Sequence, residues 1–169
     1  MSKNFSLKDF QNQLTHRLQT ARALPAISSR LGFKVFGQNW LVNLADIHEV
    51  LPVPATLSVP GAKRWFHGVA NIRGNLYGVS DLSDFLFDKP TPDSSHARLL
   101  LAQSKFGVNA ALLVEQTLGL KHLSQLVPDH PGSQSPFASQ YFRDTDGQSW
   151  VEIQLATLLT DSSFMAAEA

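Results

Sequence analysis

The sequence contains no cysteine, and this absence excludes several classes of protein. Disulfide frameworks, thiolate nucleophiles and zinc ribbons all need a residue that the chain does not have. Charge is also scarce: charged residues make up 17% of the 169 residues, and 14 basic residues balance 14 acidic ones. Because phosphate binding needs a basic face, this neutral chain is a poor candidate for binding nucleic acid, and equally for electrostatic attachment to acidic membranes.

Long apolar runs are absent as well. The longest runs, such as residues 110–114, are far shorter than the roughly 18 residues of a membrane helix. The N-terminus carries Lys3, Lys8 and Asp9 and has no continuous apolar core, so no signal peptide is visible. The sequence therefore predicts a soluble cytoplasmic protein without direct membrane insertion.

Catalytic and metal-binding motifs are missing too. None of the six histidines has HxxxH, HxH or HExxH spacing, and the chain has no GxSxG, GxxxxGK[ST] or GxGxxG motif. Asp81 and Asp84 could form an acid–base pair of carboxylates. Their spacing before Phe85 fits the cap and first-turn acid of a short helix more easily. We therefore predict that the protein is not an enzyme and needs no metal or cofactor.

The pattern of apolar residues divides the chain into two parts. In residues 1–25 apolar side chains recur every three or four residues, which predicts a helical N-terminal extension. Beyond residue 30 about nine or ten short strands alternate with turns, as is typical of small barrels or sandwiches. We predict a short helix over 155–159 and a frayed tail over 163–169. The predicted turns and loops are Gly37-Gln38-Asn39, 73–75, 89–95, 105–107, 128–136 and Asp146-Gly147.

The segment from Val59 to Leu82 is rich in glycine, aromatic and basic residues. Arg73 lies between an apolar strand and a Gly-Asn turn, and a semi-buried arginine there would need a carboxylate partner because an unpaired buried charge is costly. Trp65 and Phe66 follow two basic residues, a combination enriched at protein interfaces. For Phe66 a place in the core is the better interpretation.

In this segment the motifs VPG (59–61), GVANIRG (68–74) and SDL (80–82) resemble, in that order, the signature of the CheW-like coupling domain. The resemblance covers roughly residues 30–160. It implies a mainly β domain over 26–162, built as two small five-stranded β-barrel-like subdomains with a shared core, in addition to the N-terminal helix. It also implies that the protein has no catalytic activity.

The resemblance further implies partners. Proteins of this family couple the cytoplasmic tip of a chemoreceptor to the regulatory domain of a CheA-type histidine kinase, so we expect a cytoplasmic adaptor recruited to membrane receptor arrays. WFHGVANIRG (65–74) and the added N-terminal helix look closer to the PilI-like branch, which serves type IV pili and twitching motility.

Site residues follow from the resemblance position by position. Arg73 matches the arginine of the family's Asn-Ile/Leu-Arg-Gly motif, which is important for coupling, and Asn71 and Gly74 match its neighbours. Glu49 matches an acidic residue that pairs with that arginine in relatives. Two residues beside it, Ile47 and Val50, are expected to form an exposed apolar rim for the receptor.

Two segments depart from the family pattern. Lys63-Arg64-Trp65 replaces a small or proline-containing segment, so these residues are candidates for partner choice. Residues 75–78 replace a more β-branched strand. Two other functions remain open: a CheW-like scaffold for a polarity or cyclase-linked signalling partner, and a small-barrel protein that binds a ligand or nucleic acid.

Overall fold

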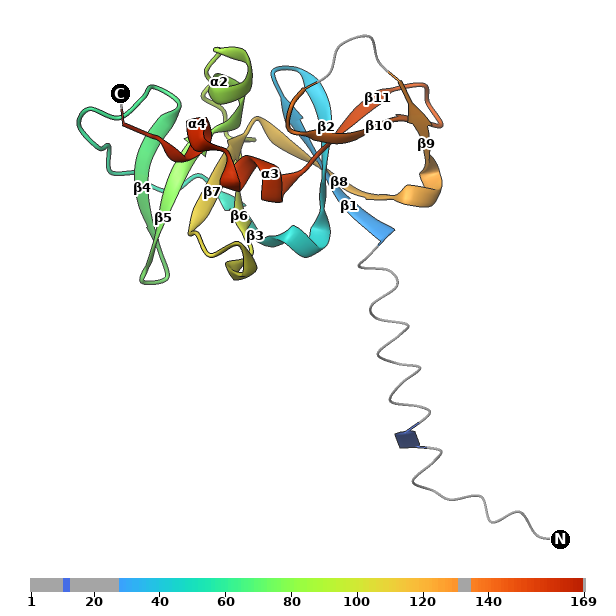
Figure 1. Cartoon of the computed structure of the whole chain (residues 1–169), viewed down its shortest axis with the longest axis horizontal. Helices are drawn as coiled ribbons and strands as arrows, with labels where there is room; N and C mark the ends of the chain where they lie inside the picture. The colour runs from blue at the N-terminus through green and yellow to red at the C-terminus, as the bar shows by residue number, and fades with distance from the viewer. Residues whose placement is uncertain (1–10, 13–27, 131–134, 169) are drawn as a thin grey trace, which may run out of the picture.

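The structure is a computed structural model that describes residues 11–12, 28–130 and 135–168. The predicted N-terminal helix therefore lies outside the described residues, apart from Gln11 and Asn12, which have helical backbone. About half of the described residues form two β-sheets that lie side by side (Figure 1). This arrangement confirms the prediction of a mainly β fold.

The first sheet has six strands in the order β8-β1-β2-β11-β10-β9. Neighbouring strands run antiparallel, except that β11 pairs with β2 in parallel. The strands are β1 (Ser29–Val35), β2 (Gln38–Asn43), β8 (Gln116–His122), β9 (Leu126–Asp129), β10 (Ala138–Asp144) and β11 (Ser149–Ile153).

This sheet has one strand more than the five that we predicted, because β9 occupies the start of a segment expected to be a loop. Pro128 had suggested the loop, since proline cannot donate a hydrogen bond to a neighbouring strand. The structure places Pro128 on an outer strand of the sheet, opposite Phe142 of β10, where the missing N–H is tolerated.

The second sheet has five strands in the order β3-β6-β7-β5-β4, with β5 and β7 parallel. The strands are β3 (Ile47–Pro52), β4 (Phe66–Ile72), β5 (Asn75–Asp81), β6 (Arg98–Ala102) and β7 (Ala110–Val114). Short 3-10 turns, η1 (Leu44–Asp46), η2 (Ser104–Phe106) and η3 (Leu123–Gln125), connect strands. The helices are α2 (Leu82–Phe87), α3 (Leu155–Thr160) and α4 (Ser162–Met165).

Two hairpins turn on residue pairs in which both members have positive φ. Phe36 and Gly37 (φ 48° and 70°) join β1 to β2, and Arg73 and Gly74 (φ 53° and 84°) join β4 to β5. Such pairs match the right-handed twist of the flanking strands. The first turn begins one residue before the predicted Gly37-Gln38-Asn39, because Gln38 already pairs with Val35.

The predicted shared core lies between the two sheets. Strand β6 shows how it arises: Leu100 faces this shared core, whereas Leu99 and Leu101 face a second cluster within the five-stranded sheet. Successive side chains of a strand point to opposite faces, so a strand that is buried on both faces needs a continuous apolar run. Trp40 of β2 and Phe164 of α4 also belong to the shared core.

The C-terminal segment, predicted to be frayed from residue 163, is instead ordered through residue 168. Phe164 is 5% exposed, and Asp161 caps α4 by accepting hydrogen bonds from the backbone N–H groups of Ser163 and Phe164. Beyond α4, the backbone N–H of Lys63 donates to the carbonyl of Ala167 (2.7 Å). Burial of one aromatic side chain therefore ties the tail to the segment before β4, where Figure 1 shows the C-terminus.

Candidate partner-binding site

Arg73 is displayed by the tight turn between β4 and β5. Its φ of 53° is unusual for a residue other than glycine, and Gly74 follows with φ 84°. The side-chain oxygen of Asn71 accepts a hydrogen bond from the Gly74 backbone N–H (2.9 Å). Asn71 and Gly74 therefore set the shape of the turn, and the arginine side chain is left 71% exposed.

The structure brings Arg73 together with Glu49, as the sequence predicts. The Arg73 guanidinium donates two hydrogen bonds to the Glu49 carboxylate, and the Nη2 to Oε1 distance is 2.6 Å. Glu49 lies on β3 and Arg73 follows β4, which are the two outer strands of the five-stranded sheet. The sheet must therefore curl until its edges approach each other, which accounts for the barrel-like form expected of this subdomain.

Within the pair, Glu49 and Arg73 each favour the charged form of the other. The hydrogen bond from Arg73 lowers the pKa of the Glu49 carboxyl, and the same bond raises the pKa of Arg73. Ion pairs this exposed contribute little to stability because water and salt screen them. The pair is therefore better suited to recognition, since a guanidinium held in fixed orientation can meet a carboxylate of another protein with defined geometry.

The apolar surroundings of the pair differ from the predicted rim. Ile47 is only 7% exposed and belongs to the shared core, so it cannot contact a partner. Val50 is exposed, as predicted, and Leu76 is exposed at the start of β5, opposite Asn71. Leu76 was not among the predicted site residues, although its place directly after the Gly-Asn turn was a usable signal. We call Leu76, together with Glu49 and Arg73, the pair surface; Val50 follows Glu49 along β3, so its side chain points to the opposite face of the sheet.

Arg64 lies at the other end of β4 and has a different set of partners. Its Nε donates to Asp84 Oδ2 (2.8 Å), and its Nη2 donates to Asp88 Oδ1 (2.6 Å). Asp84 is buried on α2, and its hydrogen bond raises the pKa of Arg64 above the ordinary range. Strand β4 has seven residues, which at about 3.3 Å each span about 23 Å. Arg64 and Arg73 therefore do not form one basic patch.

Trp65 is half-buried and packs against other rings. It stacks on Phe164 (ring centroids 5.5 Å apart) and meets Phe85 edge to face (5.1 Å). Phe66 packs over Gly78, where an added Cβ would lie 3.1 Å from the Phe66 ring. Trp65 thus helps to join the start of β4 to α2 and α4, and Phe66 packs across to β5. The exposure of Trp65, which the sequence left open, is intermediate, and so is that of Phe66.

Gly68 is required by a close approach of two backbone segments. Its φ is 122°, and a Cβ there would lie 2.0 Å from the carbonyl oxygen of Leu57. The neighbouring residue Val69 exchanges two backbone hydrogen bonds with Leu57, of 2.8 and 2.9 Å. Glycine at this position lets the segment after β3 attach to the outer edge of β4.

Asp81 has the structural role that its position predicts. Its buried carboxylate caps α2 by accepting from the backbone N–H groups of Ser83 and Asp84. It also accepts from the Thr91 backbone N–H (2.8 Å), and His67 Nε2 lies 3.5 Å away. Burial alone would raise the pKa of Asp81, but the hydrogen bonds from His67 and Thr91 outweigh it and lower that pKa. The carboxylate is thus occupied by structural hydrogen bonds rather than held ready for acid–base chemistry.

Among the described residues, no three histidine, aspartate or glutamate side chains are grouped so as to hold a metal ion. No helix in the described part of the chain is long and apolar enough to cross a membrane.

The structure is thus a β-rich domain of two sheets with a common core and an exposed arginine–carboxylate pair. The family model of the CheW-like domain matches residues 30–163. The chain therefore belongs to the CheW-like domain family, whose members are non-catalytic scaffold proteins, and the resemblance seen in the sequence is confirmed.

Individual proteins agree with this assignment. Protein PilI of Pseudomonas aeruginosa strain PAO1 is 29% identical over 142 residues, which cover 81% of this chain and 78% of PilI. The crystal structure of the scaffolding protein TtCheW from Thermoanaerobacter tengcongensis superposes with a TM-score of 0.69 at 19% identity, and the match covers 83% of this chain and 92% of TtCheW. The first similarity supports the expected PilI-like branch, and the second supports the fold.

Proposed function

We propose that this chain is a cytoplasmic adaptor that couples the cytoplasmic tip of a chemoreceptor to the regulatory domain of a CheA-type histidine kinase. The pathway proposed from the similarity to PilI is control of type IV pili and twitching motility. The adaptor would act without catalysis and would reach the membrane through its receptor. The observation that carries the proposal is the Glu49–Arg73 pair, which stands at the surface and whose arginine lies in the segment that resembles the family's Asn-Ile/Leu-Arg-Gly motif.

The pair surface has the composition of a protein interface. The arginine is exposed and fixed by two hydrogen bonds, and the apolar side chain of Leu76 is exposed at the start of the strand that follows the Arg73 turn. Arginine is enriched among residues that dominate binding energy, and apolar neighbours exclude water around it. Because the turn presents Arg73 before any partner arrives, little ordering entropy is lost on binding.

Lys63 and Arg64 remain our candidates for partner choice. Arg64 is largely exposed although it is bound to Asp84 and Asp88, so its outer face is open to a partner. The length of β4 separates it from Arg73. We propose that it belongs to a second contact region, distinct from the pair surface.

Titration calorimetry with a CheA-type kinase regulatory domain tests the proposal. We expect Arg73→Glu to weaken binding at least tenfold, because the introduced carboxylate repels Glu49 and destroys the arginine's contact with the kinase. The matched control is Arg143→Glu: Arg143 is also an exposed arginine paired with a carboxylate, that of Asp129 (3.0 Å), but it lies on the six-stranded sheet. This control should bind like the wild type.

The double variant Glu49→Arg/Arg73→Glu distinguishes two roles of the pair. It restores an ion pair of opposite orientation, so binding recovers if the pair only holds the two edges of the sheet together. If Arg73 itself contacts the kinase, binding stays weak. The proposal is wrong if the wild-type chain does not bind the kinase domain, or if Arg73→Glu binds as well as Arg143→Glu.

A further inference from the structure

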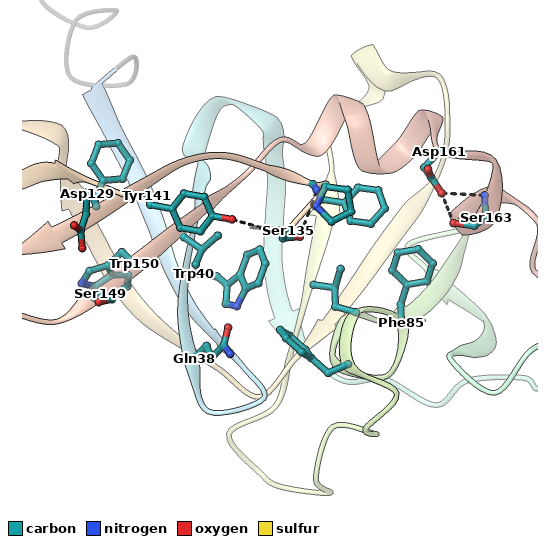
Figure 2. Close-up of a pocket in the computed structure, with 16 residues that line it drawn as sticks. Gln38, Trp40, Phe85, Asp129, Ser135, Tyr141, Ser149, Trp150, Asp161 and Ser163 are labelled. Carbon is teal, nitrogen blue, oxygen red and sulfur yellow. Dashed lines mark hydrogen bonds between the residues drawn. The ribbon is translucent and has the colours of Figure 1, made fainter. Parts of the chain in front are cut away.

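A cavity of about 710 Å³ lies at the junction of the two sheets. One side of it is formed by β2, β10 and β11 of the six-stranded sheet, and the other side by α2, which follows the last residue of β5. Figure 2 shows the lining side chains converging on this space from both sides. Its volume is within the range of about 300–1,000 Å³ that is typical of small-molecule sites. It is separate from the pair surface, none of whose residues lines it.

Seven of the sixteen residues that line the cavity are aromatic. Rings line the space from both sides, together with polar side chains such as Gln38, Ser135 and Ser149, so the wall combines apolar surface with polar groups that can fix the orientation of a ligand. A planar ring in this space would find aromatic surfaces at suitable distances for stacked or edge-to-face contacts. The main aromatic lining residues are Trp40, Phe85, Phe87, Phe137, Tyr141 and Trp150.

One polar atom in this wall has no hydrogen-bond partner. Trp40 is 1% exposed, and among the described residues its indole Nε1–H is one of two buried side-chain polar groups left unpaired. Trp150 in the same wall is different, because its indole N–H donates to Asp144 Oδ2 (2.8 Å). Figure 2 shows the Trp40 indole among the lining residues, with its nitrogen on the side of Gln38. Buried donors are nearly always paired, so an acceptor from outside the chain would complete this site.

The charge of the wall restricts the ligand further. Asp129 and Asp161 line the cavity, and hydrogen bonds keep both carboxyl groups ionised. The backbone N–H of His130 lowers the pKa of Asp129, and the hydroxyl of Ser163 lowers the pKa of Asp161. Among the described residues, Arg143 forms an ion pair with Asp129, and no ion pair neutralises Asp161. An anionic ligand would meet negative charge here and is disfavoured.

We propose that this junction cavity binds a neutral aromatic small molecule that carries a carbonyl or similar acceptor, which takes the hydrogen bond of Trp40 Nε1–H. Such a ligand would contact β2 and α2 at the same time, and it would thereby hold the two subdomains in one relative position. The site is independent of the proposed adaptor function, because the pair surface lies outside it. It would give the scaffold a means of responding to a small molecule.

Prodan, a neutral naphthalene dye with one ketone, is a suitable probe of the full chain. We expect saturable binding with increased dye emission, and a downfield shift of the Trp40 indole N–H signal in ¹⁵N-resolved NMR spectra as the ketone oxygen accepts its hydrogen bond. Trp40→Phe keeps a ring against Phe87 but removes the N–H, so it should weaken prodan about five- to tenfold, the loss expected for one hydrogen bond. Trp65→Phe is the matched control, because Trp65 does not line the cavity.

A second probe separates the hydrogen bond from the ring contacts. The analogue 2-dimethylaminonaphthalene has the same rings without the ketone, so wild-type protein should bind it more weakly than prodan and Trp40→Phe should bind it like wild type. The inference is overturned if prodan does not saturate, if the Trp40 signal stays unchanged at saturation, or if the two probes bind the wild type equally. None of these results bears on kinase binding, which is measured separately with Arg73→Glu.

Discussion

The C-terminal segment offers the sharpest test of how this domain is held together. Phe164 is 5% exposed and stacks on Trp65, and its ring also meets Phe85 edge to face with centroids 5.0 Å apart. Removing a buried phenylalanine side chain typically costs about 3–5 kcal/mol, because apolar contacts are lost and a cavity remains. We expect Phe164→Ala to be destabilised by that amount.

The size of the chain converts this free energy into a melting temperature. For domains of about 150–250 residues, 1 kcal/mol shifts Tm by about 2–4 °C, so Tm should fall by about 6–20 °C. Urea unfolding followed by circular dichroism measures the free energy, and calorimetry measures Tm. Met165→Ala is the matched control, since Met165 is the next residue and is 50% exposed. Its effect should stay within about 0.5 kcal/mol.

Equal stability of the Phe164→Ala and Met165→Ala variants would refute the reasoning, since residues 163–168 would then behave as the frayed tail that the sequence suggested. Kinase binding supplies a second readout. Phe164 packs beside Trp65, at the opposite end of β4 from Arg73, so the folded Phe164→Ala variant should bind the kinase domain like wild type. Loss of binding together with stability would show that the tail acts on the pair surface.

Two further predictions concern β4. Gly68→Ala should lower the free energy of unfolding by about 1–3 kcal/mol for the strained φ and by about 1–3 kcal/mol more for the clash with Leu57. Gly147 also has positive φ but has open space around it, so Gly147→Ala should lose only the first amount. Equal urea midpoints for the two variants would contradict this. The hydrogen bond to Asp81 raises the pKa of His67, so the pair should stabilise the fold below the unfolded pKa near 6.5 and lose that contribution as pH rises through the folded pKa. Urea midpoints measured from acidic to alkaline pH should show this decline in the wild type and less of it in His67→Gln, and identical profiles would exclude it.

Much of the local structure could be read from the residues. Asp81 was recognised as a helix cap because aspartate accepts from free N–H groups at the first turn. The Asp146-Gly147 hairpin was likewise confirmed, since glycine supplies the positive φ that its tight turn needs, here 78°. These features depend on neighbours within a few residues, and such neighbours are visible in a sequence.

The errors have a different cause. Ile47 was assigned to an exposed rim because it adjoins Glu49, yet it lies in the shared core. A shift in register between Ile47 and Glu49, where β3 pairs with β6, breaks the simple alternation along the strand. Pro128 and Phe164 were misread for a similar reason: whether a strand is an outer one, or a ring finds a buried site, depends on residues distant in the sequence.

By itself, the sequence determined the family, the mainly β character and the residues of the central motif, because motif order, apolar alternation and turn chemistry are local properties. Only the tertiary structure decided where those residues meet. Glu49 contacts Arg73 because the sheet curls until its outer strands approach, while Arg64 is drawn to α2 and Trp65 to Phe164. The junction cavity and the unpaired N–H of Trp40 also exist only once the two sheets pack together, because no single segment of the chain contains both walls.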